Sequence, residues 1–496
     1  MTLHVSSPFP PVAALEQWRA RYPKFGAALD RGGSPPSALR YLGLSLWQDG
    51  AVPEAVEALE AAAGLAPDDA ALLADLGALR SFSGRKADAL NAFIASLERD
   101  PSRIQVWLGV AGLCNEIGDK DAAENAYVAA LELEPASVDA CTGLGLIYIE
   151  RGRFEDAVRL LSGAVARGVE SGAVHACLGQ SLYLIGRFAE ARTALAVAAQ
   201  AFPGEVTIIR RYAGAAFAAA AIESTVEAAI DAYRAAAGAY AEDTLAACRS
   251  AFQALCGFGH GEAALRLGEA ILAMVPDDPI IPFHLDALRG RAHERASRGY
   301  VAACFDRYAE NFDRHLVEIL HYRLPETLRT LLEAAGRRFP RILDLGCGTG
   351  LSAAGLATVG DELVGVDLSA RMLEKAKARN LYARLVEDDA IAFLDANGAP
   401  FDLIVALEMI IYLGDLSALF AGAARNLRPG GLFAFSFEAG AGRAHALSPC
   451  GRFVHNPTYV EGLWSGNFDC LFAQQTTIRL EANRPVAGRL VLLRKK

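Results

Sequence analysis

The sequence lacks the features that mark secreted, membrane and nucleic-acid-binding proteins. Its N-terminus, MTLHVSSPFPPVAAL, has neither a positively charged region nor an unbroken apolar stretch, and no apolar run approaches the ~18 residues of a membrane span. Acidic residues outnumber basic ones by 58 to 48, which gives a net charge of −10, whereas clamping nucleic acid requires a basic surface. We therefore predict a cytoplasmic protein that binds neither membrane nor nucleic acid.

The nine cysteines lack any pairing pattern. They are scattered singly, with no Cys-x-x-Cys and no Cys/His cluster at zinc spacing. Such residues are typically small core residues. We expect reduced thiols, several of them buried, and no metal site.

Length and composition indicate an ordered protein of several units. The 496 residues exceed a typical domain of roughly 100 to 200 residues, so two or three units are expected. The chain is 53% hydrophobic and 21% charged, and its frequent alanines favour helix.

The first half of the sequence repeats with a step of 34 residues. Four kinds of residue keep this step: proline (Pro67, Pro101, Pro135, Pro203), glycine at two positions (Gly43, Gly77, Gly145, Gly179 and Gly50, Gly84, Gly118, Gly152, Gly186), alanine (Ala55, Ala89, Ala123, Ala157, Ala191) and a large apolar residue (Leu59, Phe93, Tyr127, Leu161, Leu195). This signature resembles the tetratricopeptide repeat (TPR), a pair of helices A and B.

Each repeated residue has a physical reason to be there. The first glycine lets helix A lie close to helix B, and the second supplies the left-handed turn that ends helix A. The alanine sits where helix B meets its neighbours, and the proline ends helix B.

We predict about seven helical pairs over residues 36–280, two of them degenerate, preceded by a helical cap in residues 1–35. The good repeats are placed at residues 36–69, 70–103, 104–137, 138–171 and 172–205, and a last one at 245–278. The cap contains one helix, Pro11 to Asp30.

A TPR solenoid usually presents a concave groove for a peptide or a partner protein. The array is therefore predicted to recruit a protein partner or substrate. The alternative is that it holds a dimer together or only packs against the rest of the chain, and no basic pair stands out as a carboxylate clamp.

The second half changes character after three prolines at positions 276, 279 and 282. A charged linker helix is predicted at residues 281–300, and alternating strands and helices follow over residues 301–496. The key stretch, Arg341-Ile-Leu-Asp-Leu-Gly-Cys-Gly-Thr-Gly350, is a short apolar strand that ends in an acid and three alternating glycines.

This glycine motif has two possible ligands. A dinucleotide site would show Gly-x-Gly-x-x-Gly with a helix N-terminus open to the pyrophosphate. Here the spacing is Gly-x-Gly-x-Gly, and Asp344 just before it would repel a phosphate but suit an ammonium group. The motif favours S-adenosylmethionine (SAM), whose methionine end carries an ammonium.

Later strands also end in acids. Asp367 follows Leu363–Val366, Asp389 follows Ala383–Glu387, and Glu408 follows Phe401–Val405. Because open α/β sheets bind ligands at the carboxyl ends of their strands, these acids are expected at one site. The element order resembles class I SAM-dependent methyltransferases, and the whole chain resembles the predicted TPR-containing methyltransferases of bacteria. The expected fold is an all-α TPR solenoid followed by an α/β Rossmann-like methyltransferase domain with a mostly parallel seven-stranded sheet.

The resemblance implies a role for each matching residue. Asp344, Gly346 and Gly348 would line the methionine moiety, Asp367 the ribose and Asp389 the adenine. The rest of the pocket would be completed by Leu368, Ala390, Glu408 and Met409, with Tyr308 and Phe312 as a lid. Many relatives have Asp or Asn where Glu408 stands, and Phe312 or Met409 could equally be plain core residues.

The reaction implied is an in-line displacement of the sulfonium methyl, in which positioning and desolvation supply most of the acceleration. No catalytic residue is identified, because a general base is needed only for a protonated acceptor. The groups expected nearest the pocket mouth are His315, Tyr322, Tyr412 and His455, each of which could instead be hydrogen-bonded to backbone. Three functions stay open: a methyltransferase whose protein substrate is held by the repeats, a small-molecule methyltransferase tethered by them, and a non-catalytic SAM-binding scaffold.

Overall fold

The computed structural model describes residues 11–237, 244–291, 293–442, 444–481 and 484–496. Residues 1–10 of the predicted cap lie outside these ranges. The chain folds into two compact units, residues 1–182 with 194–203 and residues 183–193 with 204–496. Within the described ranges, no helix has both the length and the apolar composition needed to cross a bilayer.

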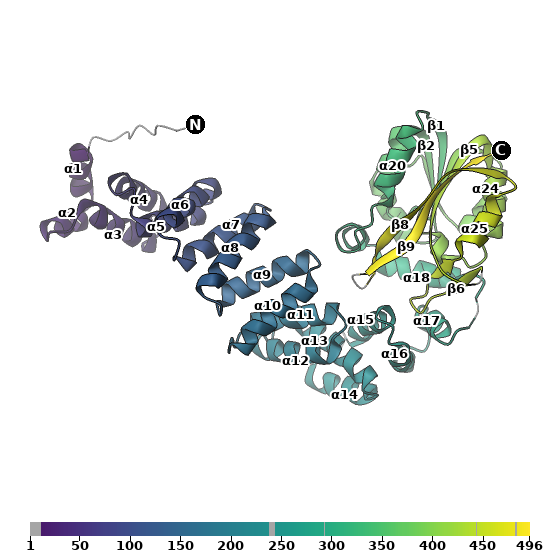
Figure 1. The fold of residues 1–496 in the computed structure, drawn as a ribbon, viewed down its shortest axis with the longest axis horizontal. Helices are drawn as coiled ribbons and strands as arrows, with labels where there is room; N and C mark the ends of the chain where they lie inside the picture. Colours follow the sequence, from purple (N-terminus) through teal and green to yellow (C-terminus); the bar gives the residue numbers. More distant parts are fainter. Residues whose placement is uncertain (1–10, 238–243, 292, 443, 482–483) are drawn as a thin grey trace. The chain divides into compact units, whose positions relative to one another are not determined.

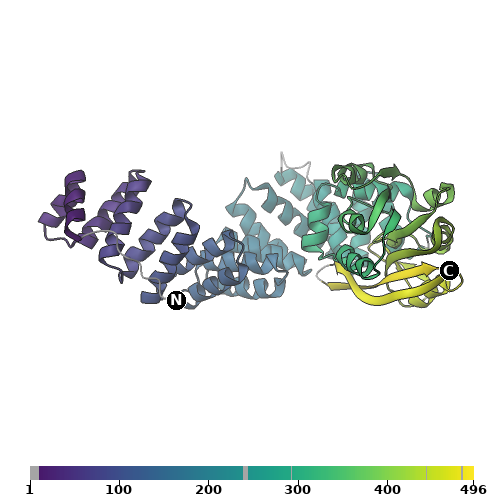
Figure 2. The same cartoon turned by 90° about the horizontal axis from the view of Figure 1, so that it is seen from above.

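Seven helical pairs follow one another in the described part of the array (Figure 1). They are α3 (Pro35–Gln48) with α4 (Val52–Leu65), α5 (Ala70–Phe82) with α6 (Lys86–Arg99), α7 (Ile104–Glu116) with α8 (Lys120–Leu133), α9 (Val138–Glu150) with α10 (Phe154–Ala166), α11 (Gly172–Leu184) with α12 (Phe188–Ala201), α13 (Val206–Ile222) with α14 (Val226–Ala237), and α15 (Thr244–Gly257) with α16 (Gly261–Met274). In the first unit, successive pairs lie side by side (Figure 2). Each repeat predicted from the 34-residue step contains one pair.

The single helix predicted at the N-terminus is wrong. The chain forms two helices there, α1 (Pro11–Arg21) and α2 (Pro23–Asp30), with Tyr22 in an extended conformation between them. Pro23 causes the break, because the residue before a proline is kept out of the helical region and a proline starts a helix well at its first position.

The repeated glycines and large apolar residues meet as the sequence predicted. A Cβ atom on Gly77 would lie 2.5 Å from the ring of Phe93, and one on Gly43 would lie 2.8 Å from the side chain of Leu59. The five glycines that end the A helices all have φ between +70° and +86°: Gly50, Gly84, Gly118, Gly152 and Gly186. The recurring alanines of the B helices are fully buried. Close helix packing therefore explains the small residues at the first glycine position and at the alanine position, and the left-handed turn explains the second glycine position.

We expect Gly77→Ala to destabilise the protein, although alanine favours helix. The added methyl group would force the buried Phe93 ring aside, and overpacking of this kind costs about 1–3 kcal/mol, more than the ~1 kcal/mol gained in helix propensity. The matched control is Gly64→Ala in α4, where no described atom lies within 4 Å of the new methyl group. Thermal unfolding followed by circular dichroism should show a lower midpoint for the first variant and an equal or higher one for the second. Equal midpoints would contradict this account of the packing.

The second unit contains a seven-stranded sheet in the order β3-β2-β1-β4-β5-β9-β8. The strands are β1 (Phe339–Leu345), β2 (Gly360–Asp367), β3 (Arg384–Glu387), β4 (Phe401–Ala406), β5 (Leu427–Glu438), β8 (Phe468–Glu481) and β9 (Arg484–Lys495). The first five pair in parallel, and β9 pairs antiparallel with both β5 and β8. The predicted fold class, a TPR array followed by a mostly parallel Rossmann-like sheet, is confirmed.

Each face of this sheet is covered by helices (Figure 1). One buried core joins the sheet to α20 (Leu324–Ala334) and α21 (Ala353–Val359), and the other joins it to α23 (Ala390–Ala396), α24 (Ser417–Asn426) and α25 (Pro457–Trp464). The helix α22 (Ala370–Ala378) connects β2 to β3. A small hairpin of β6 (His445–Leu447) and β7 (Phe453–His455) follows β5. With both faces covered, the carboxyl ends of the parallel strands are the natural place for a ligand.

The stretch predicted as a linker helix is built into the second unit. It forms α17 (Ile281–Leu288) and the start of α18 (Arg298–Tyr308). In α17, Phe283 packs on Tyr300 with ring centroids 4.4 Å apart, and both belong to a buried cluster with Phe453. The buried Asp278 accepts hydrogen bonds from the first backbone amides of α17 and forms an ion pair of 3.8 Å with Arg307 of α18. The predicted domain limits remain a prediction.

Candidate cofactor site

A glycine loop connects the end of β1 to α21 and lies beside the end of β2. Gly346, Gly348 and Gly350 have φ values of +68°, +54° and +83°, a left-handed region that glycine adopts without steric cost. The loop is fastened to β2, because the amide of Gly346 donates to the carbonyl of Val366 at 2.8 Å and the amide of Gly348 donates to Asp367 at 2.8 Å. The glycine spacing therefore produces a tight loop at the carboxyl edge of the sheet, in which Gly346 and Gly348 are partly exposed.

Asp344, the acid before this loop, is buried at the end of β1. The hydroxyl of Tyr382 donates a hydrogen bond of 2.7 Å to it. Burial raises the pKa of Asp344 to about 7, although the bond from Tyr382 lowers it, and nearby Asp367 raises it further. A buried carboxylate of this kind lacks a cationic partner in the described protein and suits a ligand that brings a positive charge.

Asp367 stands at the end of β2 and orders the next loop. Its two oxygens accept hydrogen bonds from the amides of Gly348 and Ser369 at 2.8 and 2.9 Å. Burial raises its pKa despite these bonds. Leu368, directly after it, packs against the buried cluster that contains Phe283, Tyr300 and Phe453. The predicted ribose and pocket residues of β2 thus lie beside the glycine loop.

Asp389 follows β3 and begins α23. Its carboxylate accepts a hydrogen bond from the amide of Ala392 at 3.1 Å and lies 3.5 and 3.6 Å from Arg295 and Arg298. Ala390 is partly buried against the core of the sheet. Asp389 therefore caps α23 and also pairs with two exposed arginines. These partners compete with a ligand for its carboxylate, which the sequence did not indicate.

Aromatic residues of α18 and the short α19 (Phe312–Arg314) meet the glycine loop. The ring of Phe312 lies 3.7 Å from the place that a Cβ on Gly348 would take. Tyr308 meets Phe312 edge to face at 5.2 Å between centroids, and Phe305 meets Tyr412 in the same way at 5.5 Å. Phe312 thus lies beside the loop and also packs against the core that contains α20 and α21, and Tyr308 contacts Phe312. Their role as a lid remains a prediction.

Three acids that the sequence reasoning missed tether this aromatic segment to the loops. Asp306 accepts a hydrogen bond of 2.6 Å from Ser369, Glu310 pairs with Lys375 at 2.8 Å, and Asp313 bonds to both Thr349 and Arg379. Their signal was present in the segment Phe305–Leu316, where acids recur every three or four residues on one helical side.

Glu408 and Met409 follow β4 on the other side of the loop. The side chain of Met409 would lie 2.7 Å from a Cβ on Gly346, so it closes the loop from this side. Glu408 has a φ of +55°, its amide donates to the hydroxyl of Ser436 at 3.0 Å, and its carboxylate pairs with Arg479. Met409 thus contacts the glycine loop, and Glu408 is bonded to residues of β5 and β8. Their place in the cofactor pocket remains a prediction.

The four weak catalytic candidates have different environments. His455 is fully buried and its Nε2 donates to the carbonyls of Leu413 and Gly414 at 2.9 and 3.1 Å, while burial lowers its pKa to about 4. Burial raises the pKa of Tyr322 and of Tyr412. His315, at the start of the π-helical turn η2 (His315–Ile319), is partly buried and hydrogen-bonded to Tyr308. His455 has the backbone-bound environment of a structural histidine, and its buried Nδ1 has no hydrogen-bond partner among the described residues.

The assembled site can hold a ligand with a cation and a vicinal diol. A buried carboxylate at the end of β1 fits the cation, a second carboxylate at the end of β2 fits two hydroxyl groups, and the glycine loop leaves room for close backbone approach. These features match the chemistry of SAM.

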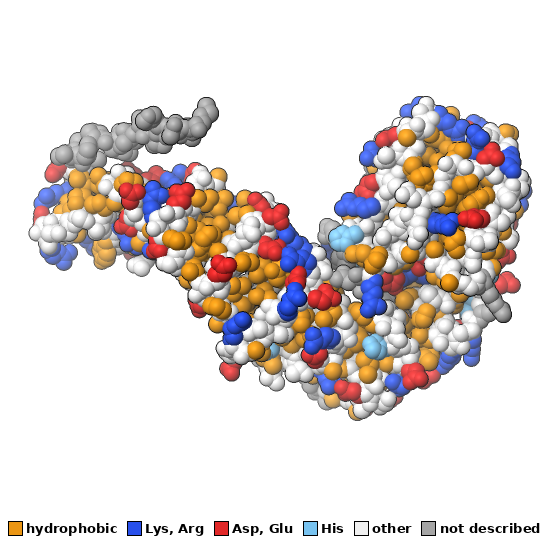
Figure 3. Space-filling view, in the orientation of Figure 1, with side chains coloured by type: hydrophobic (Ala, Val, Ile, Leu, Met, Phe, Trp, Pro, Cys, Tyr) orange, Lys and Arg blue, Asp and Glu red, His pale blue; other side chains and the backbone are white. Residues whose placement is uncertain are grey.

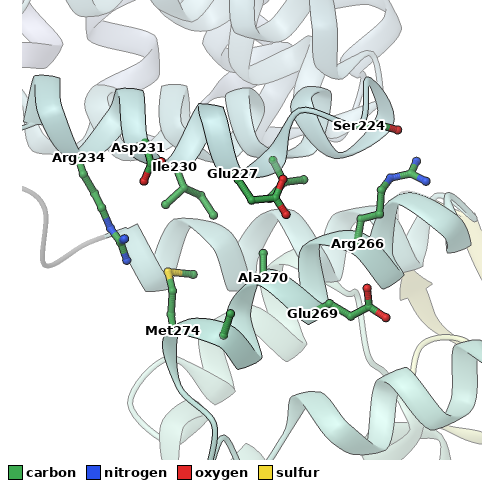
Figure 4. A pocket seen from close by; sticks show the side chains of 11 residues that line it. Ser224, Glu227, Ile230, Asp231, Arg234, Arg266, Glu269, Ala270 and Met274 are labelled. Carbon is green, nitrogen blue, oxygen red and sulfur yellow. The ribbon is translucent and has the colours of Figure 1, made fainter.

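A separate hollow of about 400 Å³ lies between α14 and α16 (Figure 4). Its lining mixes apolar residues such as Ile230 and Met274 with the charged residues Glu227, Asp231 and Arg266. None of the predicted site residues lines it. It belongs to the helical array of the second unit and is distinct from the cofactor site.

Comparisons with known proteins agree with this division. A family model described as a methyltransferase domain matches residues 342–431, and one described as a tetratricopeptide repeat matches residues 23–70, 75–137, 116–168 and 142–206. Among curated proteins, the chain is 35% identical over 136 residues to a malonyl-[acyl-carrier protein] O-methyltransferase of Enterobacter lignolyticus, covering 27% of this chain and 52% of that one. It is 29% identical over 149 residues to a ubiquinone biosynthesis O-methyltransferase of Xylella fastidiosa, covering 28% and 61%. The chain thus spans about half the length of these relatives.

Solved structures resemble either half of the chain. The N-methyltransferase NodS of Bradyrhizobium japonicum in complex with S-adenosyl-L-homocysteine (SAH) is 20% identical, with a TM-score of 0.33, covering 39% of this chain and 98% of that one. A tetratricopeptide repeat protein of Parabacteroides merdae is 17% identical, with a TM-score of 0.35, covering 52% and 100%.

Proposed function

Because the chain joins tetratricopeptide repeats to a class I methyltransferase domain, we propose that it is an enzyme that binds SAM and transfers its methyl group to an acceptor recruited through the repeats. The observation that carries this proposal is the acid at the glycine loop. Asp344 is buried beside three left-handed glycines, where a carboxylate opposes a dinucleotide phosphate and favours an ammonium group.

The residues of the site divide the cofactor between them. Asp344, Gly346 and Gly348 would hold the methionine end, Asp367 the ribose and Asp389 the adenine. Leu368, Ala390 and Met409 would supply apolar walls, and Tyr308 and Phe312 would exclude water from above. When bound, the cofactor supplies a methyl group on a sulfonium sulfur, and the protein contributes orientation and desolvation.

The surface of the repeats supports recruitment of a protein. Hydrophobic side chains gather on the visible face of the first unit (Figure 3). Tyr41 and Phe82 are both 68% exposed, and further exposed apolar residues of this unit are Ile94, Ile117, Val128, Leu133, Val138 and Leu146. Exposed apolar surface of this extent is typical of interaction sites. We propose that the exposed apolar surface of these repeats binds the acceptor protein or a partner that delivers the acceptor.

A small-molecule methyltransferase tethered by its repeats is the second candidate. The two relatives named above carry O-methyltransferase names, which places hydroxyl and carboxyl groups first among the acceptors to be tried. A non-catalytic scaffold is disfavoured, because Asp344, the glycines and Asp367 are all present, and Asp367 accepts a hydrogen bond from Gly348 of the loop.

The experiment that tests the proposal uses SAM labelled in its methyl group. The protein is incubated with labelled SAM and cell extract, and label is then resolved into protein and small molecules. We expect label in protein with the wild type and at least ~10-fold less with Asp367→Ala, because loss of the ribose contact leaves donors unpaired. Label found only in small molecules would favour the tethered enzyme, and no label in either fraction would favour the scaffold.

A further inference from the structure

Two unfavourable features coincide at Glu408. Its φ of +55° is uncommon for any residue but glycine and costs of order 1 kcal/mol or more. Its Oε1 atom is buried and has no hydrogen-bond partner among the described residues. A buried polar atom without a partner also costs free energy, and such exceptions in folded proteins call for an explanation.

The other oxygen of Glu408 is held by a buried charge network. Arg479 of β8 pairs with Oε2 of Glu408 and with Glu438 of β5, and lies 3.6 Å from Glu481. Arg452 pairs with Glu438 and Glu481 on the opposite side. The Arg479 side chain is only 4% exposed. Arg479 therefore holds Oε2 of Glu408, while Oε1 is left without a hydrogen-bond partner among the described residues.

The charge of this network limits what Oε1 can meet. Three glutamates face two arginines, so the cluster carries an excess negative charge when all are ionised. Burial raises the pKa of Glu408, and the adjacent Arg479 lowers it. An anionic group would be repelled here, whereas a hydroxyl or amino group can donate to Oε1.

The position of Glu408 places it on the acceptor's side of the site. β1 lies between β2 and β4. The proposed ribose and adenine contacts, Asp367 and Asp389, are on the β2 and β3 side, so an acceptor has to approach from the β4 side. Met409 packs against Gly346 at this boundary, which puts its neighbour Glu408 next to the end of the glycine loop where the methionine moiety is expected.

We propose that Glu408 contacts the methyl acceptor rather than the cofactor, and that its free Oε1 atom takes the proton of the acceptor's hydroxyl or amino group during transfer. This inference rests on the proposed function. The acceptor's oxygen or nitrogen forms a bond to the methyl carbon while the carbon–sulfur bond breaks and its electron pair stays on sulfur. The acceptor's proton passes to Oε1, which makes the carboxyl group neutral until it returns the proton to water.

The acceptor is accordingly a neutral alcohol, phenol or amine, or an ammonium group. Arg479 is a positioning residue, because it acts only by holding Oε2. Glu408 was assigned to the cofactor pocket from the sequence, and its paired Arg479 is 71 residues further along the chain.

The test needs no knowledge of the acceptor. Sinefungin is a SAM analogue in which an amine-bearing carbon replaces the methylated sulfur, so its amine occupies the place of the transferred methyl group. SAH is the same framework without that group. We expect calorimetry to show that the wild type binds sinefungin at least ~10-fold more tightly than SAH, because the amine donates to Oε1. The Glu408→Gln variant should bind sinefungin and SAH with about equal affinity, and its affinity for SAH should differ from that of the wild type by less than about threefold.

Glu481→Gln is the matched control, because it removes a carboxylate from the same network without offering a free oxygen at the site. It should keep the preference for sinefungin. Glu408→Asp is the second variant, since aspartate tolerates the left-handed backbone better than glutamate. Its side chain is shorter by one methylene, so the carboxylate is withdrawn from the site, and the preference for sinefungin over SAH should decrease.

The inference is overturned if the wild type shows no preference for sinefungin over SAH, or if Glu408→Gln keeps that preference. It is also overturned if Glu408→Gln weakens the binding of SAH as strongly as that of sinefungin, since Glu408 would then contact the cofactor. Failure of SAH and SAM to bind the wild type at all would instead overturn the proposed function, and this inference with it.

Discussion

Asp344→Asn should weaken SAM binding at least about tenfold while it makes the ligand-free protein more stable above pH 7. Both effects arise from one buried carboxylate. Asparagine keeps an oxygen for the hydroxyl of Tyr382 but has no charge to pair with the ammonium group of the ligand, and a charged hydrogen bond is worth roughly 1.5–3 kcal/mol.

The direction of the stability change follows from the pKa. Burial raises the pKa of Asp344 to about 7, above its value of about 3.9 in the unfolded chain. The folded state therefore holds its proton more tightly, and the free energy of unfolding falls as the pH rises from about 4 to 7 and stays low above 7. Replacing the buried charge with a neutral amide should recover up to about 4 kcal/mol at pH 8, since about three pKa units at about 1.4 kcal/mol each are involved, and little at pH 4.

Calorimetry and thermal unfolding at pH 6 and pH 8 measure both effects. In the wild type, SAM affinity should decrease below pH 7, with proton release on binding that appears as a dependence of the heat on buffer ionisation enthalpy. A variant that binds SAM normally and is less stable at pH 8 would show that Asp344 serves only the fold.

Removal of residues 1–171 should spare SAM binding and strongly reduce methyl transfer to a dilute protein acceptor. This truncation deletes α1 to α10 and keeps α12, whose Phe188 belongs to the core formed by α13 and α15. The repeats contribute effective concentration rather than chemistry. We expect the transfer rate at low acceptor concentration to fall at least ~10-fold and to recover at saturating acceptor. The affinity for SAM should stay within about threefold of the wild-type value.

Point variants provide the matched comparison. Phe82→Ser removes an exposed ring of the repeats, whereas Leu471→Ser removes an exposed apolar side chain of β8. Only the first should raise the acceptor concentration needed for half-maximal rate. Undiminished transfer by the truncated protein at low acceptor concentration would favour the tethered small-molecule enzyme.

The repeats could be predicted almost completely from the sequence, because their determinants are local and recur. The contact of Gly77 with Phe93 recurs one 34-residue step earlier as the contact of Gly43 with Leu59. Close packing of the two helices therefore explains the residue types at several positions at once. The break at Pro23 was missed because apolar periodicity continued through it.

The acids that end β1, β2 and β3 were also predicted, since a strand followed by an acid is visible in the chain. What stayed hidden depends on contacts between distant residues. Tyr382 meets Asp344 across 38 positions, and Asp306 meets Ser369 across 63. The hairpin of β6 and β7 was also missed, because each strand has only three residues and too short a pattern to recognise.

The central claim, that the domain binds SAM, is tested most directly by calorimetric titration of the full chain with SAM and with NAD. The account predicts saturable binding of SAM and no heat with NAD, and it predicts that Asp367→Ala weakens SAM binding by roughly 1–3 kcal/mol. Saturable binding of NAD by a wild-type protein that gives no heat with SAM would contradict it.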